Sequence, residues 1–208
     1  SKLVQATALT VADGPKEYST TLGNIRSLPK RLPPNLERLN IRRTRITEIQ
    51  NSLLSLTSPS TLKELQMENN NLMNDHITLQ PYKNVEKVKF DNCNLKYIDV
   101  SHNYKLKVLE LNSNNFTSIN LTGAYNLEDL KLSWNNKFTG SINICNLKQL
   151  RYIEMGQTPL VFLFPNCMSE LVEMRSLQLS SNKLQNIPDL SKMTKLQVIN
   201  FEDYPMSM

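Results

Sequence analysis

One short pattern of apolar residues recurs along the chain, and this repeat limits the possible folds more than any other feature. In each copy, apolar residues occupy the first, fourth and sixth positions, a small polar residue or cysteine the ninth, and another apolar residue the eleventh or twelfth. The copies start at residues 36, 62, 85, 106, 127, 150, 174 and 196, in steps of 21 to 26 residues, and the last is incomplete. A period of this length predicts a solenoid in which each copy forms one coil.

The spacing inside each copy predicts a short strand followed by a turn. Apolar residues at the fourth and sixth positions alternate with outward-facing ones, as in a strand that points two side chains into one core. The ninth residue stands where the chain leaves the strand. An asparagine amide there can pair with backbone groups that the turn would otherwise bury without a partner. Asparagine fills this position in four copies and threonine or cysteine in three: Thr44, Asn70, Cys93, Asn114, Asn135, Thr158 and Asn182.

These residues resemble the leucine-rich repeat family over roughly residues 36–204, and the regular 21-residue coils are similar to those of bacterial cell-surface members. The resemblance implies an α/β solenoid with a curved parallel sheet on its concave face and an irregular or short-helical convex side. A terminal coil would expose its core, so we expect residues 1–35 to form an N-terminal capping region. Residues 36–208 are then the solenoid of about eight repeats, and the whole chain is one domain.

The three cysteines do not predict a disulfide-stapled fold, because they cannot all pair and none belongs to a CxxC motif. Cys93 holds an interior ninth position, so we expect a buried thiol. Cys145 and Cys167 are expected to pack against their apolar neighbours. The sequence leaves the redox compartment open, and no run of about 18 apolar residues predicts a membrane span.

Enzymatic motifs are absent from the sequence. It has two histidines, His76 and His102, in different connections, and none of the common nucleophile, phosphate-loop or zinc-binding patterns. We therefore expect neither an enzyme nor a cofactor or metal site.

The outward-facing strand positions form columns along the concave face, and the middle coils carry the candidate partner-binding residues. Trp134, the single tryptophan, is expected at the rim of this face with Tyr152 beside it, where aromatic residues often dominate binding. The alternatives are that the alternating charges only neutralise one another and that Trp134 packs over the inserted residues 136–138. The candidates are Lys89, Glu110, Asn112, Lys131, Ser133, Trp134, Tyr152 and Glu154.

A basic cluster in the first coil is a second candidate site. Arg38, Arg42 and Arg43 could bind an anionic partner such as an acidic protein or a sulfated glycan. The alternative is a solvated capping surface. Nucleic acid is not expected, because no aromatic residues lie among the basic ones.

The family resemblance implies a non-enzymatic module that binds a protein or a glycan through its concave face, as part of a secreted or cell-surface protein. Three alternatives stay open: the sensing ectodomain of a receptor, an intracellular (cytoplasmic) scaffold, and a structural spacer of a larger surface protein. Two glycosylation sequons, at Asn115 and Asn120, are assigned no function from the sequence, because chance matches are expected in an asparagine-rich chain.

Overall fold

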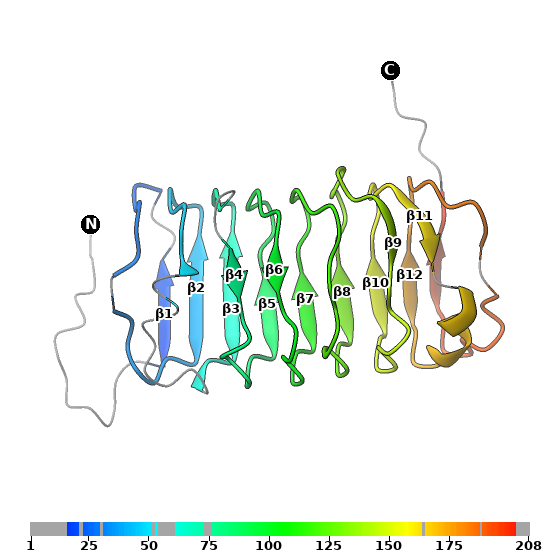
Figure 1. Cartoon of the computed structure of the whole chain (residues 1–208), viewed down its shortest axis with the longest axis horizontal. Helices are drawn as coiled ribbons and strands as arrows, with labels where there is room; N and C mark the ends of the chain where they lie inside the picture. The colour runs from blue at the N-terminus through cyan, green and yellow to red at the C-terminus, as the bar shows by residue number, and fades with distance from the viewer. Residues whose placement is uncertain are drawn as a thin grey trace, which may run out of the picture.

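The computed structural model describes residues 16–20, 23–29, 31–50, 53, 61–72, 76–163, 165–187 and 189–202. Within these residues, nine parallel strands form one sheet, and each strand pairs with those of the preceding and following coils. The strands lie side by side along the long axis of the molecule (Figure 1). In sheet order they are β1 (Glu17–Thr20), β2 (Arg38–Arg42), β3 (Glu64–Glu68), β5 (Lys87–Lys89), β7 (Val108–Glu110), β8 (Asp129–Lys131), β10 (Tyr152–Glu154), β12 (Ser176–Gln178) and β13 (Val198–Asn200).

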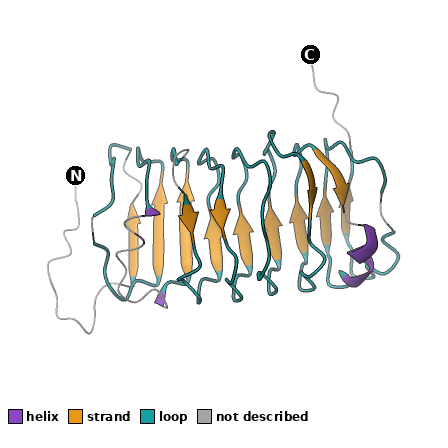
Figure 2. Cartoon of the chain, viewed as in Figure 1, coloured by secondary structure: helices purple, strands orange, loops and turns teal. Residues whose placement is uncertain are grey.

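The return segments, which carry the chain from one strand to the next, contain little regular structure (Figure 2). Short strands pair there in two places, β4 (Ile77–Thr78) with β6 (Ile98–Asp99), and β9 (Gly140–Ile142) with β11 (Leu160–Leu163). One 3-10 helix, η2, spans Pro165–Glu170. The predicted fold class, a parallel-sheet solenoid with irregular or short-helical connections, is confirmed.

The core lies between the sheet and the return segments. The apolar first, fourth and sixth positions are buried in every copy from the first to the seventh. Burying each such side chain contributes about 1.5–3 kcal/mol, and a neighbouring coil is needed to cover it. Ile199 of the last coil is 53% exposed, because no described strand packs beyond β13. This exposure agrees with the expectation that a terminal coil exposes its core.

The ninth-position ladder forms as predicted, and Asn114 shows its geometry. Its Oδ1 accepts hydrogen bonds from the backbone N–H groups of Cys93 (3.1 Å) and Leu95 (3.0 Å) in the preceding coil. Its Nδ2 donates to the carbonyls of Phe90 (2.6 Å) and Leu111 (3.0 Å). The amide therefore satisfies backbone groups of two coils that burial would otherwise leave unpaired.

The residue before the ladder position has a left-handed backbone in each of the first seven copies. Its φ lies between 51° and 63°, and its N–H donates to a carbonyl of the following coil. Asparagine accepts this conformation at low cost, but bulky residues do not. The residues are Arg43, Asn69, Asn92, Ser113, Trp134, Gln157 and Ser181.

A disulfide joins Cys145 and Cys167, whose Cα atoms are 5.0 Å apart. The expectation that these two residues only pack against apolar neighbours is therefore wrong. They lie 22 residues apart in consecutive return segments, and stacking brings such segments within bonding reach. Cys93 is a buried free thiol, as predicted.

The region predicted as the N-terminal cap contributes a strand to the main sheet. β1 pairs in parallel with β2, from Glu17 opposite Arg38 to Thr20 opposite Ile41. Residues 1–15 lie outside the described residues, and the division at residue 35 stays a prediction.

Candidate functional site

The outward surface of the nine-stranded sheet, here called the sheet face, corresponds to the predicted concave face. It presents the third, fifth and seventh residues of every copy. The strand register confirms the predicted columns, because each fifth residue lies opposite the fifth residue of the next coil. This row reads Asn40, Gln66, Lys89, Glu110, Lys131, Glu154, Gln178 and Asn200.

Glu110 is the centre of the charged cluster in the middle of this row. Its carboxylate lies 2.7 Å from Lys89 Nζ and 3.3 Å from Lys131 Nζ, on either side of it in the sheet. Its side chain is only 10% exposed. Burial alone would raise the pKa of Glu110, but the two ammonium groups outweigh it and hold the pKa below its usual value. The cluster therefore keeps a fixed negative charge between two positive ones.

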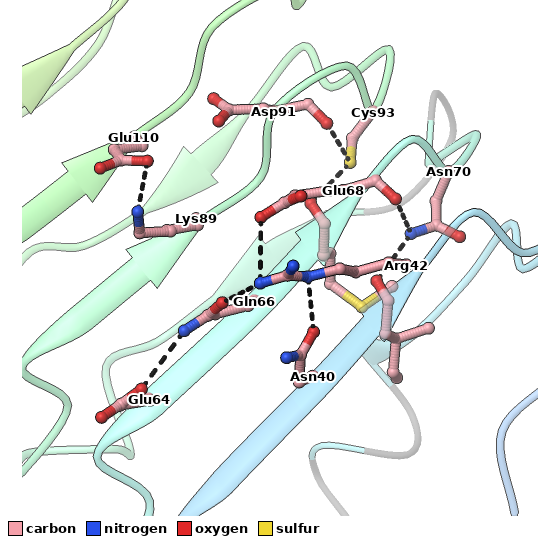
Figure 3. A network of polar contacts seen from close by, with 12 residues as sticks. Asn40, Arg42, Glu64, Gln66, Glu68, Asn70, Lys89, Asp91, Cys93 and Glu110 are labelled. Carbon is pink, nitrogen blue, oxygen red and sulfur yellow. Dashed lines mark hydrogen bonds and ion pairs between the residues drawn. The ribbon is translucent and has the colours of Figure 1, made fainter. Parts of the chain in front are cut away.

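Two of the three arginines of the first-coil cluster, Arg38 and Arg42, have acidic partners. Arg42 donates to Gln66 Oε1 at 2.8 Å and lies 3.4 Å from the carboxylate of Glu68 (Figure 3). Arg38 lies 3.7 Å from Glu64 and 3.8 Å from Glu17. Arg43 is exposed on the turn after β2. This neutralisation gives no support to an anionic glycan as the partner.

A second ladder runs along the seventh-position column, where a side chain oxygen accepts the backbone N–H of the next coil. Asp91 accepts from Asn112 N at 2.8 Å, Asn112 from Ser133 N at 2.9 Å, and Ser133 from Gly156 N at 3.0 Å. Ser180 continues the column, and its Oγ would lie 3.0 Å from a Cβ added at Gly156. The seventh-position column therefore has only small residues across coils five to seven (Ser133, Gly156 and Ser180), and we call these three the strip of small residues.

Trp134 and Tyr152 are both exposed, at 52% and 44%, but they do not form one aromatic patch. Tyr152 lies opposite Asp129 at the start of its strand, whereas Trp134 follows the end of the neighbouring strand. The two residues thus occupy the eighth and third positions of their copies, and no contact between their rings is found in the described part of the chain. The prediction that the two rings lie side by side is therefore wrong, because it ignored their different positions within the repeat.

Two carboxylates that the sequence did not single out belong to the same face. Burial raises the pKa of Asp129, although Lys131 Nζ lies 4.0 Å away and opposes the rise. Burial also raises the pKa of Asp91, against the hydrogen bond from the backbone of Asn112. Their place in the columns was visible in the sequence, but their degree of burial was not.

No metal centre is found among the described residues, which hold no group of three or more His, Cys, Asp or Glu side chains able to bind an ion. No helix in the same part of the chain is long and apolar enough to cross a membrane.

The sheet face is a polar surface with paired charges, small residues and separate exposed aromatics. Such a surface suits recognition of another molecule.

Comparison with known proteins gives no match to a family model. The chain is 27% identical over 173 residues to human oligodendrocyte-myelin glycoprotein, covering 81% of this chain and 38% of that protein. It spans 38%, 12% and 10% of the lengths of three curated relatives that it matches.

Among solved structures, the chain is similar to internalin C2 of Listeria monocytogenes, with a TM-score of 0.70, 19% identity and coverage of 92% and 84% of the two chains. It is also similar to the ectodomain of the Arabidopsis thaliana membrane receptor kinase GASSHO1/SCHENGEN3, solved in complex with CASPARIAN STRIP INTEGRITY FACTOR 2. That match has a TM-score of 0.64 and 22% identity and covers 88% of this chain and 23% of the other.

The stacked coils, the asparagine ladder and the open sheet face together define a solenoid repeat protein of the kind that serves as a binding module. With the similarities above, they show that the chain has the fold of leucine-rich repeat proteins. Both the bacterial internalin and the plant ectodomain share its fold.

Proposed function

We propose that the chain binds a protein partner through the sheet face, centred on β7, β8 and β10. The observation that carries this proposal is the strand register. It sets Glu110, Lys131 and Glu154 side by side in the middle of the sheet, with the exposed ring of Tyr152 on the same strand as Glu154. Fixed charges of both signs favour one partner and orientation, and an exposed aromatic supplies contact area.

The strip of small residues beside this cluster supports an extended partner segment. Ser133, Gly156 and Ser180 lie next to one another in the seventh-position column. Because these three residues have a small side chain or none, a peptide backbone can approach the strands closely at these positions. The plant ectodomain with a similar fold was solved in complex with an integrity factor, which accords with a protein ligand here.

A secreted or cell-surface location is part of the proposal. The Cys145–Cys167 disulfide supports it, because disulfides persist in oxidising compartments and are rare in the cytosol. The same bond weighs against the intracellular scaffold. A receptor ectodomain and a module of a larger surface protein both accord with the proposal.

The test uses partners selected from a displayed library of secreted-protein fragments against the whole immobilised chain. Lys131→Glu combined with Trp134→Ala should weaken their binding by about 2 kcal/mol or more, roughly 30-fold in Kd. Tyr152→Ala alone should weaken it by at least about 1 kcal/mol. Biolayer interferometry measures Kd, and circular dichroism checks that each variant is folded.

The matched control is Ser176→Ala with Gln178→Ala on β12, which present smaller, neutral contacts on the same face. This pair should change Kd by less than about twofold. If the β12 variant loses binding while the Lys131 and Tyr152 variants keep it, the binding centre lies elsewhere.

A further inference from the structure

A turn that recurs on the return segments fixes the orientation of an Asp or Asn side chain. In three consecutive coils, the side chain oxygen of an Asp or Asn accepts the backbone N–H two residues later. The pairs are Asp99 with Ser101 (2.9 Å), Asn120 with Thr122 (3.0 Å) and Asn143 with Cys145 (3.1 Å). This turn holds each side chain in one orientation.

Asn120 is the member of this set that belongs to a glycosylation sequon, Asn120-Leu121-Thr122. Leu121 is buried, whereas Asn120 and Thr122 are exposed. The turn uses Asn120 Oδ1, and Nδ2 has no hydrogen-bond partner among the described residues. A substituent on Nδ2 would therefore leave the turn and the core intact.

A depression of about 130 Å³ lies beside Asn120, between its return segment and the following one. Every residue that lines it is uncharged, and the polar ones include Asn143, Asn146 and Thr122. Tyr125 forms part of the wall and is 48% exposed, and its ring stacks on Tyr104 with centroids 6.1 Å apart. An exposed aromatic ring beside neutral carboxamides suits a sugar, which has both an apolar face and hydroxyl groups.

The other sequon, at Asn115, lies in a different environment. Asn115 is half-buried, and its Nδ2 donates to Asn94 Oδ1 at 3.4 Å. Asn94 in turn donates to Asn71 at 3.2 Å. A sugar on Asn115 would have to displace this row of amides across three coils.

We propose that Asn120 is an N-glycosylation site whose first sugar lies in the depression against Tyr125, and that Asn115 is a poorer acceptor. This rests on the proposed passage of the chain through a secretory pathway.

In the reaction, Asn120 Nδ2 loses one proton and bonds to C1 of an oligosaccharide. The C1–O bond to its lipid diphosphate carrier breaks, and the lipid diphosphate leaves. No oxidation or reduction takes place. The glycan would cover return segments and leave the sheet face free.

The experiment expresses the full chain behind a signal peptide in a eukaryotic cell line. Glycan occupancy is read by mass spectrometry after enzymatic release in ¹⁸O water, in both the secreted and the retained protein. Occupancy should be higher at Asn120 than at Asn115, and Thr122→Ala should abolish it at Asn120. An unmodified Asn120, or higher occupancy at Asn115, would overturn the proposal. Failure of export alone counts against the proposed location, not against the acceptor site.

A second measurement tests the place of the first sugar. In an Asn115→Gln background, protein trimmed to one sugar at Asn120 is compared with the Asn120→Asp variant. The single sugar should raise Tm by about 2 °C. Tyr125→Ala should remove this gain, whereas Tyr97→Ala, also an exposed tyrosine of a return segment, should keep it. A gain that survives Tyr125→Ala, or no gain at all, would overturn the packing of the sugar in the depression.

Discussion

Glu110 carries its charge at a position where burial opposes it. The carboxylate is stable there because Lys89 and Lys131 reach it from the two neighbouring strands. Asp91 and Asp129 lie on the same face, and burial shifts their pKa values upwards instead. The difference follows from geometry, since of these three carboxylates only Glu110 has an ammonium group within hydrogen-bond reach on each side.

Glu110→Gln should lower the free energy of unfolding at pH 7 by about 1–3 kcal/mol, because both lysines lose a charge-assisted hydrogen bond. The folded-state pKa of Glu110 is lowered from 4.5. Its stabilisation is therefore present above pH 4.5 and is lost as the pH falls through the folded-state pKa. Urea unfolding from pH 7 to 3 should show the two proteins converging in acid. A gap of constant size would contradict this account. Glu154→Gln is the control, because the Glu154 carboxylate accepts a 3.3 Å bond from the Ser133 hydroxyl, which the glutamine Oε1 can still accept.

The thiol of Cys93 gives a second test at this scale. It is fully buried, its Sγ lies 3.0 Å from the carbonyl oxygen of Met67, and burial raises its pKa to about 12. Iodoacetamide should leave Cys93 unmodified in the native protein and alkylate it in urea, because only the thiolate reacts. Mass spectrometry without reductant measures this thiol separately from the disulfide. Rapid native labelling would show that the third coil opens locally.

Each strand of the nine-stranded sheet holds only three to five residues, so these strands depend on the ladders that link them. The asparagine ladder joins buried turns, and the Asp91–Asn112–Ser133 ladder joins the seventh-position backbone. Because both ladders cross from coil to coil, loss of one member affects two strands at once.

Asn114→Ala should lower the free energy of unfolding by about 2–3 kcal/mol, since it leaves several buried backbone groups without a partner. Asn115→Ala is the matched control: the adjacent side chain makes only a 3.4 Å bond at the surface, so the change should cost less than about 0.5 kcal/mol. Urea denaturation measures both. Equal losses for the two variants would mean that the ladder amide has no special role.

At the scale of the whole molecule, stability is carried by contacts between neighbouring coils. The Cys145–Cys167 disulfide reinforces one such contact, in the return segments on either side of β10. Its closed loop is short compared with the chain, so its effect on the unfolded state is moderate.

Replacing both cysteines by serine should lower the free energy of unfolding by about 3 kcal/mol, measured by urea denaturation. Reductant should lower the Tm of the wild-type protein but not of the Cys145→Ser/Cys167→Ser variant. A Tm insensitive to reductant in both proteins would show that the bond adds nothing to the stack. Cys93→Ala in the same assay separates the effect of the free thiol.

The repeat in the sequence is enough to specify the solenoid, the strand positions and the columns of the sheet face. Each copy has two apolar residues two positions apart, and the copies follow one another at a nearly constant step. Only one alignment of the strands buries this pair in every coil, so the pattern sets the register. Adding the 21-residue step to Lys89 therefore locates Glu110 and then Lys131 in one row of the sheet face, where the strand pairing has them.

Which of these side chains are engaged depends on the folded chain. Folding pairs Arg42 with Glu68, separates Trp134 from Tyr152, and joins Cys145 to Cys167. The physical reason is that charge pairing depends on burial and on side-chain reach across coils. In the return segments, moreover, the length changes from coil to coil. There the repeat step no longer specifies which residues meet, and only the stacking of the coils brings them together.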